Sequence, residues 1–179
     1  MTTSNEAKAS NEAEASNEAE ASNEAASGLI LSNPEPSDMA ELDRIEKTIE
    51  ISAPVERVFA LVSEPGWFVN DGEYRPHEID RDGDVSLVRD PVHGDFGILT
   101  VALEAPHHVV FRWVGEGAGS TLLEFFVEEY DGGARLRVVE TGFASLPGSD
   151  ADRRAAFDGN SQGWDIELEV ARSVCESTE

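Results

Sequence analysis

The segment RLRVVETGFASLP, residues 135–147, places a carboxylate where the interior of a protein would be expected. Leu136 and Val138 share one face of a strand, and the alternation continues to Glu140 on that same face. An unpaired carboxylate in an apolar interior is costly, so it must be protonated or hydrogen-bonded. In a pocket it can bind a ligand hydroxyl or amine, or exchange protons with a substrate if its pKa is raised.

The same residues allow a second interpretation of Glu140. Thr141 and Gly142 could form a bulge that ends the strand and turns the carboxylate to water. The sequence leaves both orientations open. The first predicts a polar anchor inside a cavity, and the second predicts an ordinary filled core.

Apolar and aromatic side chains would have to form the rest of such a cavity. Trp67 and Phe68 follow the helix-terminating pair Pro65-Gly66, and Trp164 follows Gly163, which permits close approach of a helix to a sheet. A tryptophan carries one polar N–H on an apolar body, which suits the edge of a ligand site. Phe111 and Phe125 fit an ordinary core as well. The predicted wall comprises Trp67, Phe68, Leu99, Val101, Phe111, Trp113, Leu123, Phe125, Val138 and Trp164, with Glu140 as its polar contact.

Two further segments could carry metal or acid–base chemistry. RDPVHGDFG offers Asp90, His93 and Asp95, but an exposed hairpin loop is the favoured interpretation, because loops are normally polar. DGNSQGWDIELE, residues 158–169, nearly fits the calcium loop of EF-hands. Gln162 and Asp165 depart from that pattern, and the surrounding apolar spacing favours a helix. We therefore expect no metal and no cofactor.

Composition restricts the possible partners. The formal net charge is −24, with 37 acidic and 13 basic side chains. Such a chain repels phosphate backbones and anionic lipid, so we expect neither nucleic-acid binding nor membrane insertion. The single cysteine cannot form an internal disulfide. The amino terminus lacks a basic start and a long apolar run, so a cytoplasmic protein is expected.

The chain divides into a tail and one domain. Residues 4–27 repeat the unit SNEA with a period of six, and SNPEPSD follows as a linker. With few large apolar side chains to bury, such a segment cannot offset its ordering entropy. We predict a disordered acidic tail and linker over residues 1–43 and a folded domain over residues 44–179.

The elements of the domain follow from its periodicity. A strand is expected near residue 44, and APVERVFALVSEP has the apolar spacing of a short helix. About six strands separated by turn residues follow, in the manner of a meander. The last 30 or so residues carry the stripe Phe157, Trp164, Leu168 and Ala171, which predicts a long helix with a bend or break near Asn160. The order is that of an α+β fold in which an antiparallel sheet wraps around the last helix.

Three segments together carry a family resemblance: the opening IEISAPVERVFALVSEPGWF, the sheet segment LEAPHHVVFRWV and the ending VVETGF…GNSQGW. Over roughly residues 45–174, the chain resembles the bacterial homologues of the activator of the heat-shock protein 90 ATPase, in the START-like (SRPBCC) superfamily. The resemblance implies the helix-grip fold, with a cavity between the curved sheet and the long helix. Members of the superfamily bind lipids, sterols and polyketides, and a few are cyclases or hydrolases. Eukaryotic activators have a separate amino-terminal domain that docks on the chaperone, where this chain has only the repeat.

Three functions stay open at this point. The leading hypothesis is binding of a small hydrophobic or amphipathic molecule in the cavity. The second is a protein-interaction role, as an accessory factor for a chaperone or another protein partner. The third is a cofactor-free cyclase or hydrolase in which Glu140 and a histidine such as His77 move protons. The sequence leaves the catalytic residues, the ligand, the partner and the oligomeric state undetermined.

Overall fold

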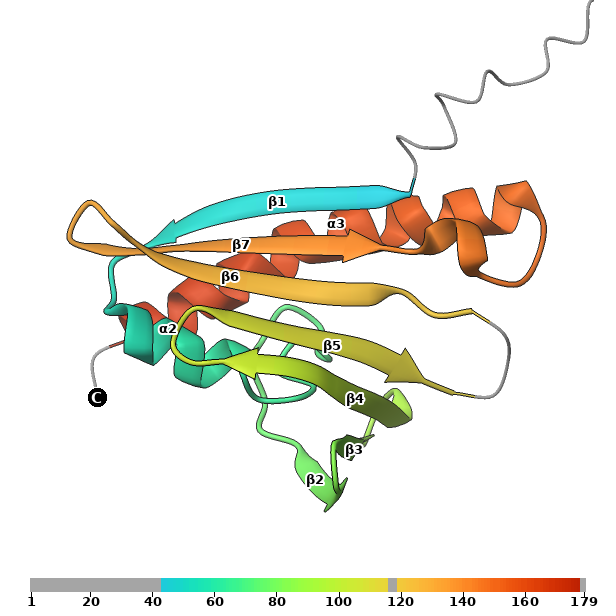
Figure 1. The fold of residues 1–179 in the computed structure, drawn as a ribbon, viewed down its shortest axis with the longest axis horizontal. Helices are drawn as coiled ribbons and strands as arrows, with labels where there is room; N and C mark the ends of the chain where they lie inside the picture. The colour runs from blue at the N-terminus through green and yellow to red at the C-terminus, as the bar shows by residue number, and fades with distance from the viewer. Residues whose placement is uncertain (1–42, 116–118, 178–179) are drawn as a thin grey trace, which may run out of the picture. The chain divides into compact units, whose positions relative to one another are not determined.

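The structure is a computed structural model that describes residues 43–115 and 119–177. Its strands form one seven-stranded antiparallel sheet (Figure 1). Its strand order is β1-β7-β6-β5-β4-β3-β2, so strands β2 to β7 form a meander and β1 pairs with the last strand. The strands are β1 (Arg44–Ile51), β2 (Glu78–Asp82), β3 (Val85–Asp90), β4 (Gly94–Glu104), β5 (His108–Val114), β6 (Leu122–Tyr130) and β7 (Gly133–Thr141).

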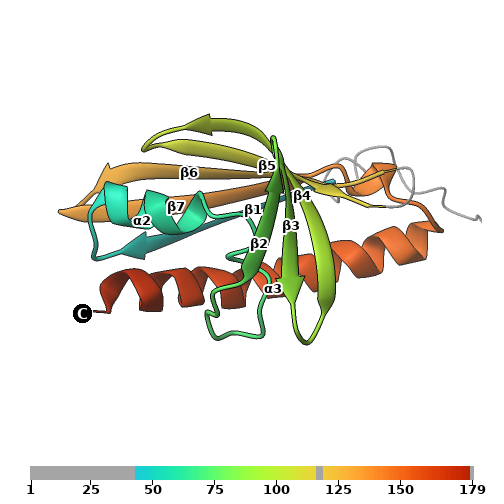
Figure 2. The same cartoon turned by 90° about the horizontal axis from the view of Figure 1, so that it is seen from below.

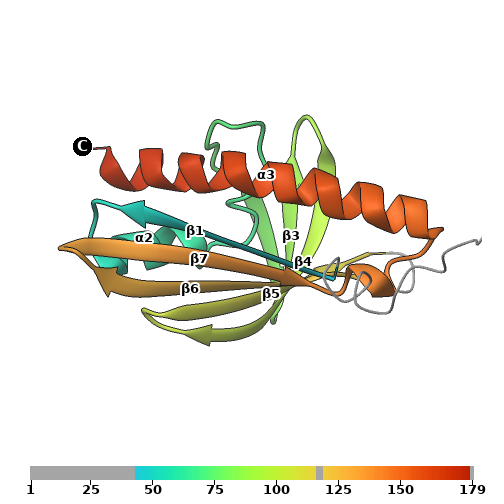
Figure 3. The ribbon, with the colours of Figure 1, turned by 90° about the horizontal axis from the view of Figure 1, so that it is seen from above.

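The short helix α2 (Val55–Val62) and the long helix α3 (Asp150–Glu176) lie on one side of this sheet, and the 3-10 turn η1 (Phe143–Ser145) follows the end of β7. Figures 2 and 3 show α3 running along β1 and β7, while β2, β3 and β4 turn out of the plane of those strands toward the helix. The predicted α+β helix-grip architecture is confirmed. The predicted tail over residues 1–43 lies outside the described residues, except for Asp43, so that boundary stays a prediction.

Helix α3 is continuous over its 27 residues, although a bend or break near Asn160 was considered from the sequence. Its start is fixed by a capping box: the Ser149 hydroxyl accepts from the Asp152 backbone N–H, and the Asp152 carboxylate accepts from the Ser149 backbone N–H. Gly159 and Gly163 each weaken a helix by about 1 kcal/mol relative to alanine. Packing against the sheet offsets that cost, and both positions face open space.

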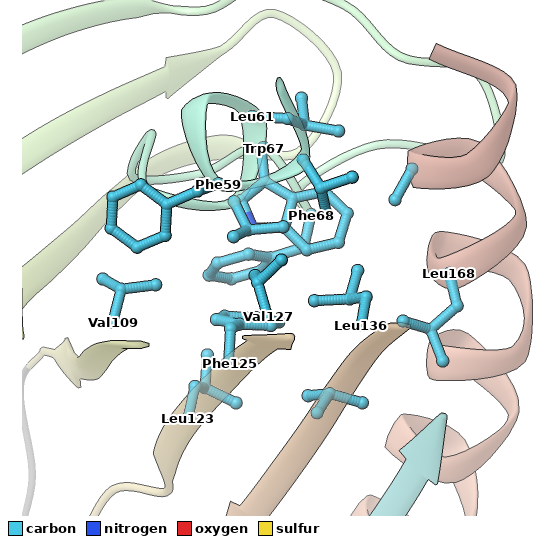
Figure 4. Close-up of a cluster of buried hydrophobic side chains, with 14 of the residues drawn as sticks. Phe59, Leu61, Trp67, Phe68, Val109, Leu123, Phe125, Val127, Leu136 and Leu168 are labelled. Carbon is cyan, nitrogen blue, oxygen red and sulfur yellow. The ribbon is translucent and has the colours of Figure 1, made fainter. Parts of the chain in front are cut away.

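The core fills the space between the inner face of the sheet and the two helices (Figure 4). Helix α2 and the turn after it contribute Phe59, Leu61, Trp67 and Phe68, which lie over Phe125 and its neighbours on the sheet. The rings pack edge-on or tilted, with centroid separations between 5.4 and 6.2 Å among Trp67, Phe68, Phe111 and Phe125. Such a ring cluster rigidly positions the loop after α2 against the sheet.

The turn that delivers Trp67 and Phe68 depends on Gly66. Its φ of +84° lies in the left-handed region, and a Cβ at this position would lie 2.6 Å from Cγ1 of Val88. Glycine is therefore required here by conformation and by space.

We expect Gly66→Ala to lower the free energy of unfolding by about 2–4 kcal/mol, because backbone strain and overpacking add together. Gly83→Ala is the matched control: Gly83 also has a positive φ, of +62°, but a Cβ there meets nothing within 4 Å. It should cost only about 1 kcal/mol. Urea denaturation measures both, and equal losses would contradict the role assigned to Val88.

None of the helices in residues 43–115 and 119–177 is both long and apolar enough to cross a membrane.

Candidate functional site

A cavity of about 150 Å³ lies between the sheet and α3. At about 30 Å³ for each water-sized unit, it has room for roughly five non-hydrogen atoms. The sheet, the loop after α2 and one face of α3 all contribute to its lining. The lining residues are Phe68, Trp113, Leu123, Glu140, Gly159, Asn160, Gly163, Trp164 and Glu167.

Glu140 is fully buried, and its carboxylate faces α3. One carboxylate oxygen accepts from Nδ2 of Asn160 at 2.9 Å, and the other accepts from Nε1 of Trp164 at 2.7 Å. Strand β7 stays paired on both sides at this position, with Ile45 and Leu123 opposite Glu140. There is thus no bulge at Glu140, and the structure places the side chain on the inner face instead of turning it to water.

Burial raises the pKa of Glu140 above its ordinary value. The Thr121 hydroxyl, the Trp164 indole and the Asn160 amide oppose this shift by donating hydrogen bonds. Hydrogen bonds from neighbouring side chains therefore hold the Glu140 carboxyl group in place. None of the described lining residues of the cavity is a lysine, arginine or histidine.

A second carboxyl group, that of Glu167, lines the same cavity. Its residue is only 7% exposed, and its Oε2 atom has no hydrogen-bond partner. Burial raises the pKa of Glu167 to about 7; donors from Asn70 and Gly72 oppose the shift, and the charge of Asp71 adds to it.

Sequence reasoning missed Glu167. Asn160, Trp164 and Glu167 nevertheless follow the spacing of i, i+4 and i+7. That spacing puts all three on one face of a helix, and it is the signal that could have identified the residue.

Residues 52–170 match a family model described as Activator of Hsp90 ATPase homolog 1-like protein. The chain belongs to this AHSA1 family. The match agrees with the resemblance that the sequence segments suggested. A comparison with curated proteins gave no match.

Solved structures share the AHSA1 fold at low identity. A protein from Chromobacterium violaceum has 19% identity and a TM-score of 0.57, and the alignment covers 76% of this chain and 99% of that one. The Aha1 dimer from Colwellia psychrerythraea has 15% identity and a TM-score of 0.55, with coverages of 74% and 96%. DynU16, from the dynemicin biosynthetic locus, has 19% identity and a TM-score of 0.57, with coverages of 75% and 48%. These similarities establish the fold.

The structure brings only part of the predicted wall to the cavity of this AHSA1-family chain. Phe68, Trp113, Leu123 and Trp164 line it together with Glu140. Four other predicted residues are buried in the core without lining it, namely Trp67, Phe111, Phe125 and Val138. Whether any of these residues contacts a ligand stays a prediction.

The placement of Leu99 and Val101 in the wall was wrong. In the pairing of β4 with β5, Ile98 lies opposite Trp113, whereas Leu99 lies opposite Arg112 on the other face of the sheet. A shift of register between Thr100 and Ala102 leaves Val101 unpaired, and it is 51% exposed. The correct inward residue at this end of β4 is Ile98, which is buried.

A larger hollow of about 640 Å³ adjoins the cavity, since Trp113 and Asn160 line both. Its other described lining residues are Asp95, Phe96, Gly97, Arg112, Val114, Gly115, Gly119, Ser120, Thr121 and Leu146. The lining of this hollow is more polar than that of the cavity and includes Arg112.

The histidine considered as a proton partner lies elsewhere. Nε2 of His77 is 3.0 Å from a carboxylate oxygen of Asp90, and both side chains are 3% exposed. The other Asp90 oxygen accepts from the backbone N–H groups of Val92 and His93, at 2.8 and 2.6 Å. Asp90 is thus a buried loop-organising residue, unlike the exposed residue expected, and His77 does not line the cavity.

Hydrogen bonds from the backbone of His93 first, and then from Val92 and His77, hold the pKa of Asp90 down at about 2, against its desolvation. A carboxyl with a lowered pKa stabilises the fold above its ordinary pKa of 3.8, and this contribution is lost as the pH falls toward 2.

We expect Asp90→Asn to lower the melting temperature at pH 7, with the difference from wild type narrowing between about pH 4 and pH 2. Asp95→Asn is the control, because Asp95 is exposed and only pairs with Arg89 at 3.4 Å. Thermal denaturation monitored by circular dichroism measures both. A constant difference across the pH range would contradict the assigned role of the Asp90 charge.

Within residues 43–115 and 119–177, no group of three or more His, Cys, Asp or Glu side chains is arranged to hold a metal ion. The segment that resembles a calcium loop, residues 158–169, lies entirely inside α3. A continuous helix cannot present its oxygen atoms in the loop geometry that calcium requires.

Proposed function

We propose that this AHSA1-family chain binds a small amphipathic molecule in the cavity between the sheet and α3, with Glu140 as a polar anchor. The observation that carries the proposal is the orientation of Glu140. Its buried carboxylate is held by Asn160 and Trp164 at the wall of an open space. A group that served only the core would be less costly as an apolar side chain.

The helical glycines support the same proposal. Gly159 and Gly163 both line the cavity, and a Cβ at either position would meet nothing within 4 Å. Alanine at these two positions would favour the helix and reduce the space. The chain therefore keeps room at the cost of helix stability, as expected where a ligand occupies the room.

The composition of the lining fits an amphipathic molecule. Phe68, Trp113, Leu123 and Trp164 provide apolar surface, while Glu140 and Asn160 provide polar contacts. Ligand pockets combine a mostly apolar wall with a few placed polar groups in this way. The volume is below the roughly 300–1,000 Å³ of typical pockets, so the cavity suits a small molecule or one end of a longer molecule that continues into the adjoining hollow.

Native mass spectrometry of protein purified from its own host tests the proposal. We expect a bound small molecule in the wild-type chain. Gly163→Leu should lose it, because the added side chain fills the cavity. Ala155→Leu should keep it, since Ala155 is exposed on the same helix. A ligand-free wild-type protein, or equal ligand in both variants, would contradict binding at this site.

A further inference from the structure

The charge of the cavity is one-sided. Glu140 reaches it from β7 and Glu167 reaches it from α3, and no lysine, arginine or histidine is among its described lining residues. Lys47 pairs with Asp165 at 2.6 Å, and neither residue is among the described lining residues of the cavity. Arg112 lines only the adjoining hollow, so no described lining residue of the cavity supplies a positive charge opposite these carboxyl groups.

Glu167 is the less satisfied of the two carboxyl groups. Glu140 accepts hydrogen bonds on both of its oxygen atoms, whereas Oε2 of Glu167 is buried and has no partner. Buried polar atoms in proteins are almost always hydrogen-bonded, and an orphaned one needs an explanation. A hydrogen-bond donor carried by a ligand would supply the missing partner, and a charged donor would supply the strongest one.

Aromatic rings form the rest of the surroundings. Phe68, Trp113 and Trp164 line the cavity, with the Phe68 centroid 5.5 Å from that of Trp113 and 5.7 Å from that of Trp164. The faces of such rings attract cations, and rings grouped around carboxylates are a general arrangement for recognising ammonium groups. The wall and the two carboxyl groups thus favour the same ligand chemistry.

We infer that the ligand is an amphipathic amine whose ammonium group lies between Glu140 and Glu167 against the rings of Phe68, Trp113 and Trp164. This inference rests on the proposed function and names its ligand class. Above about pH 7, where Glu167 is ionised, a carboxylate or phosphate ligand would meet like charge in this cavity, and a neutral alcohol would leave that charge without a counter-charge.

A small amine tests the inference in the whole protein. We choose n-butylamine, whose size matches a cavity of roughly five non-hydrogen atoms, and compare it with butan-1-ol and butanoate. Binding is followed by the indole N–H signal of Trp164 in ¹H–¹⁵N NMR spectra, because this group donates to Glu140. The amine should bind about tenfold or more tightly than the alcohol, and butanoate should bind most weakly.

Variants locate the effect. Glu167→Gln should reduce butylamine affinity by about tenfold or more and leave butanol affinity within about twofold. Glu169→Gln is the control, because Glu169 lies two residues away on the same helix, is exposed and pairs with Arg172. It should change neither affinity.

The outcomes separate this inference from the proposed function. If butan-1-ol or butanoate binds as tightly as the amine, the cavity binds ligands but the amine assignment is overturned. If butylamine does not bind, or binds without shifting the Trp164 indole signal, the amine assignment is also overturned. A failure of the proposed function itself is read separately, from the absence of any ligand in the native mass spectra.

Discussion

Replacing Trp164 by alanine is expected to lower the free energy of unfolding by about 3–5 kcal/mol, one of the two largest effects expected in this protein. Trp164 is 5% exposed, and its ring lies 5.6 Å from that of Phe125 and 5.7 Å from that of Phe68, centroid to centroid. Truncation removes this packing and also leaves one oxygen of Glu140 without its donor. Both losses act in the same direction.

Trp164→Phe separates the two contributions. Phenylalanine keeps most of the ring contacts and loses only part of the side-chain volume, but it lacks the Nε1–H donor altogether. Its loss should be about 1–3 kcal/mol, dominated by the buried carboxylate oxygen left without a partner. Urea denaturation at constant pH measures both variants. If alanine cost no more than phenylalanine, Trp164 would not be part of the packed layer between α3 and the sheet.

In the wild-type protein, ionisation of Glu167 should lower the free energy of unfolding as the pH rises, and we expect Glu167→Gln to remove this decrease. The folded pKa of Glu167, about 7, lies above its ordinary value of 4.5, so between these values the folded state holds a proton that the unfolded state has released. The contribution of this group to stability is therefore greatest below pH 4.5, falls as the pH rises, and is lost above about pH 7. The loss should amount to about 1–3 kcal/mol.

The variant should accordingly be more stable than wild type at pH 8 and show a flatter profile between pH 4.5 and 7. The groups facing Glu167 are Asn70, Asp71 and Gly72 from the loop after α2, with Glu140 across the cavity. Glu140, whose pKa is also raised, leaves a residual slope of the same sign. Urea denaturation across this range measures the profile, with Glu169→Gln as the exposed control. Parallel profiles for wild type and Glu167→Gln would contradict the assignment.

Much of the fold could be predicted because the spacing of apolar residues along the sequence indicates the helices and strands. The apolar spacing of Val55, Val58, Phe59 and Val62 marks α2, and all four are buried. The alternation through Leu136 and Val138 places Glu140 on the inner face, because the pairing of β7 is regular to its end. Such regularity is what periodicity arguments assume.

The remaining errors concern strand register, helix continuity and burial, which depend on tertiary packing. An alternating pattern of apolar residues cannot reveal the register shift at Val101. Leu99, just before the shift, lies on the opposite face of the sheet from the one predicted. Glycines at positions 159 and 163 suggested a break in α3, yet capping and packing keep the helix continuous. Glu167 was missed because helix spacing alone cannot say how wide the buried face is.

The pairing of β1 with β7 has a consequence for synthesis on the ribosome. Ile45 lies opposite Glu140, about 95 residues later in the chain, so the first strand emerges long before β7, the strand with which it pairs in the described sheet. At a synthesis rate of about 5–20 residues per second, this delay is roughly 5–20 s. The nascent chain must keep β1 unpaired throughout that interval, and the sheet can be completed only when almost all of the domain has been made.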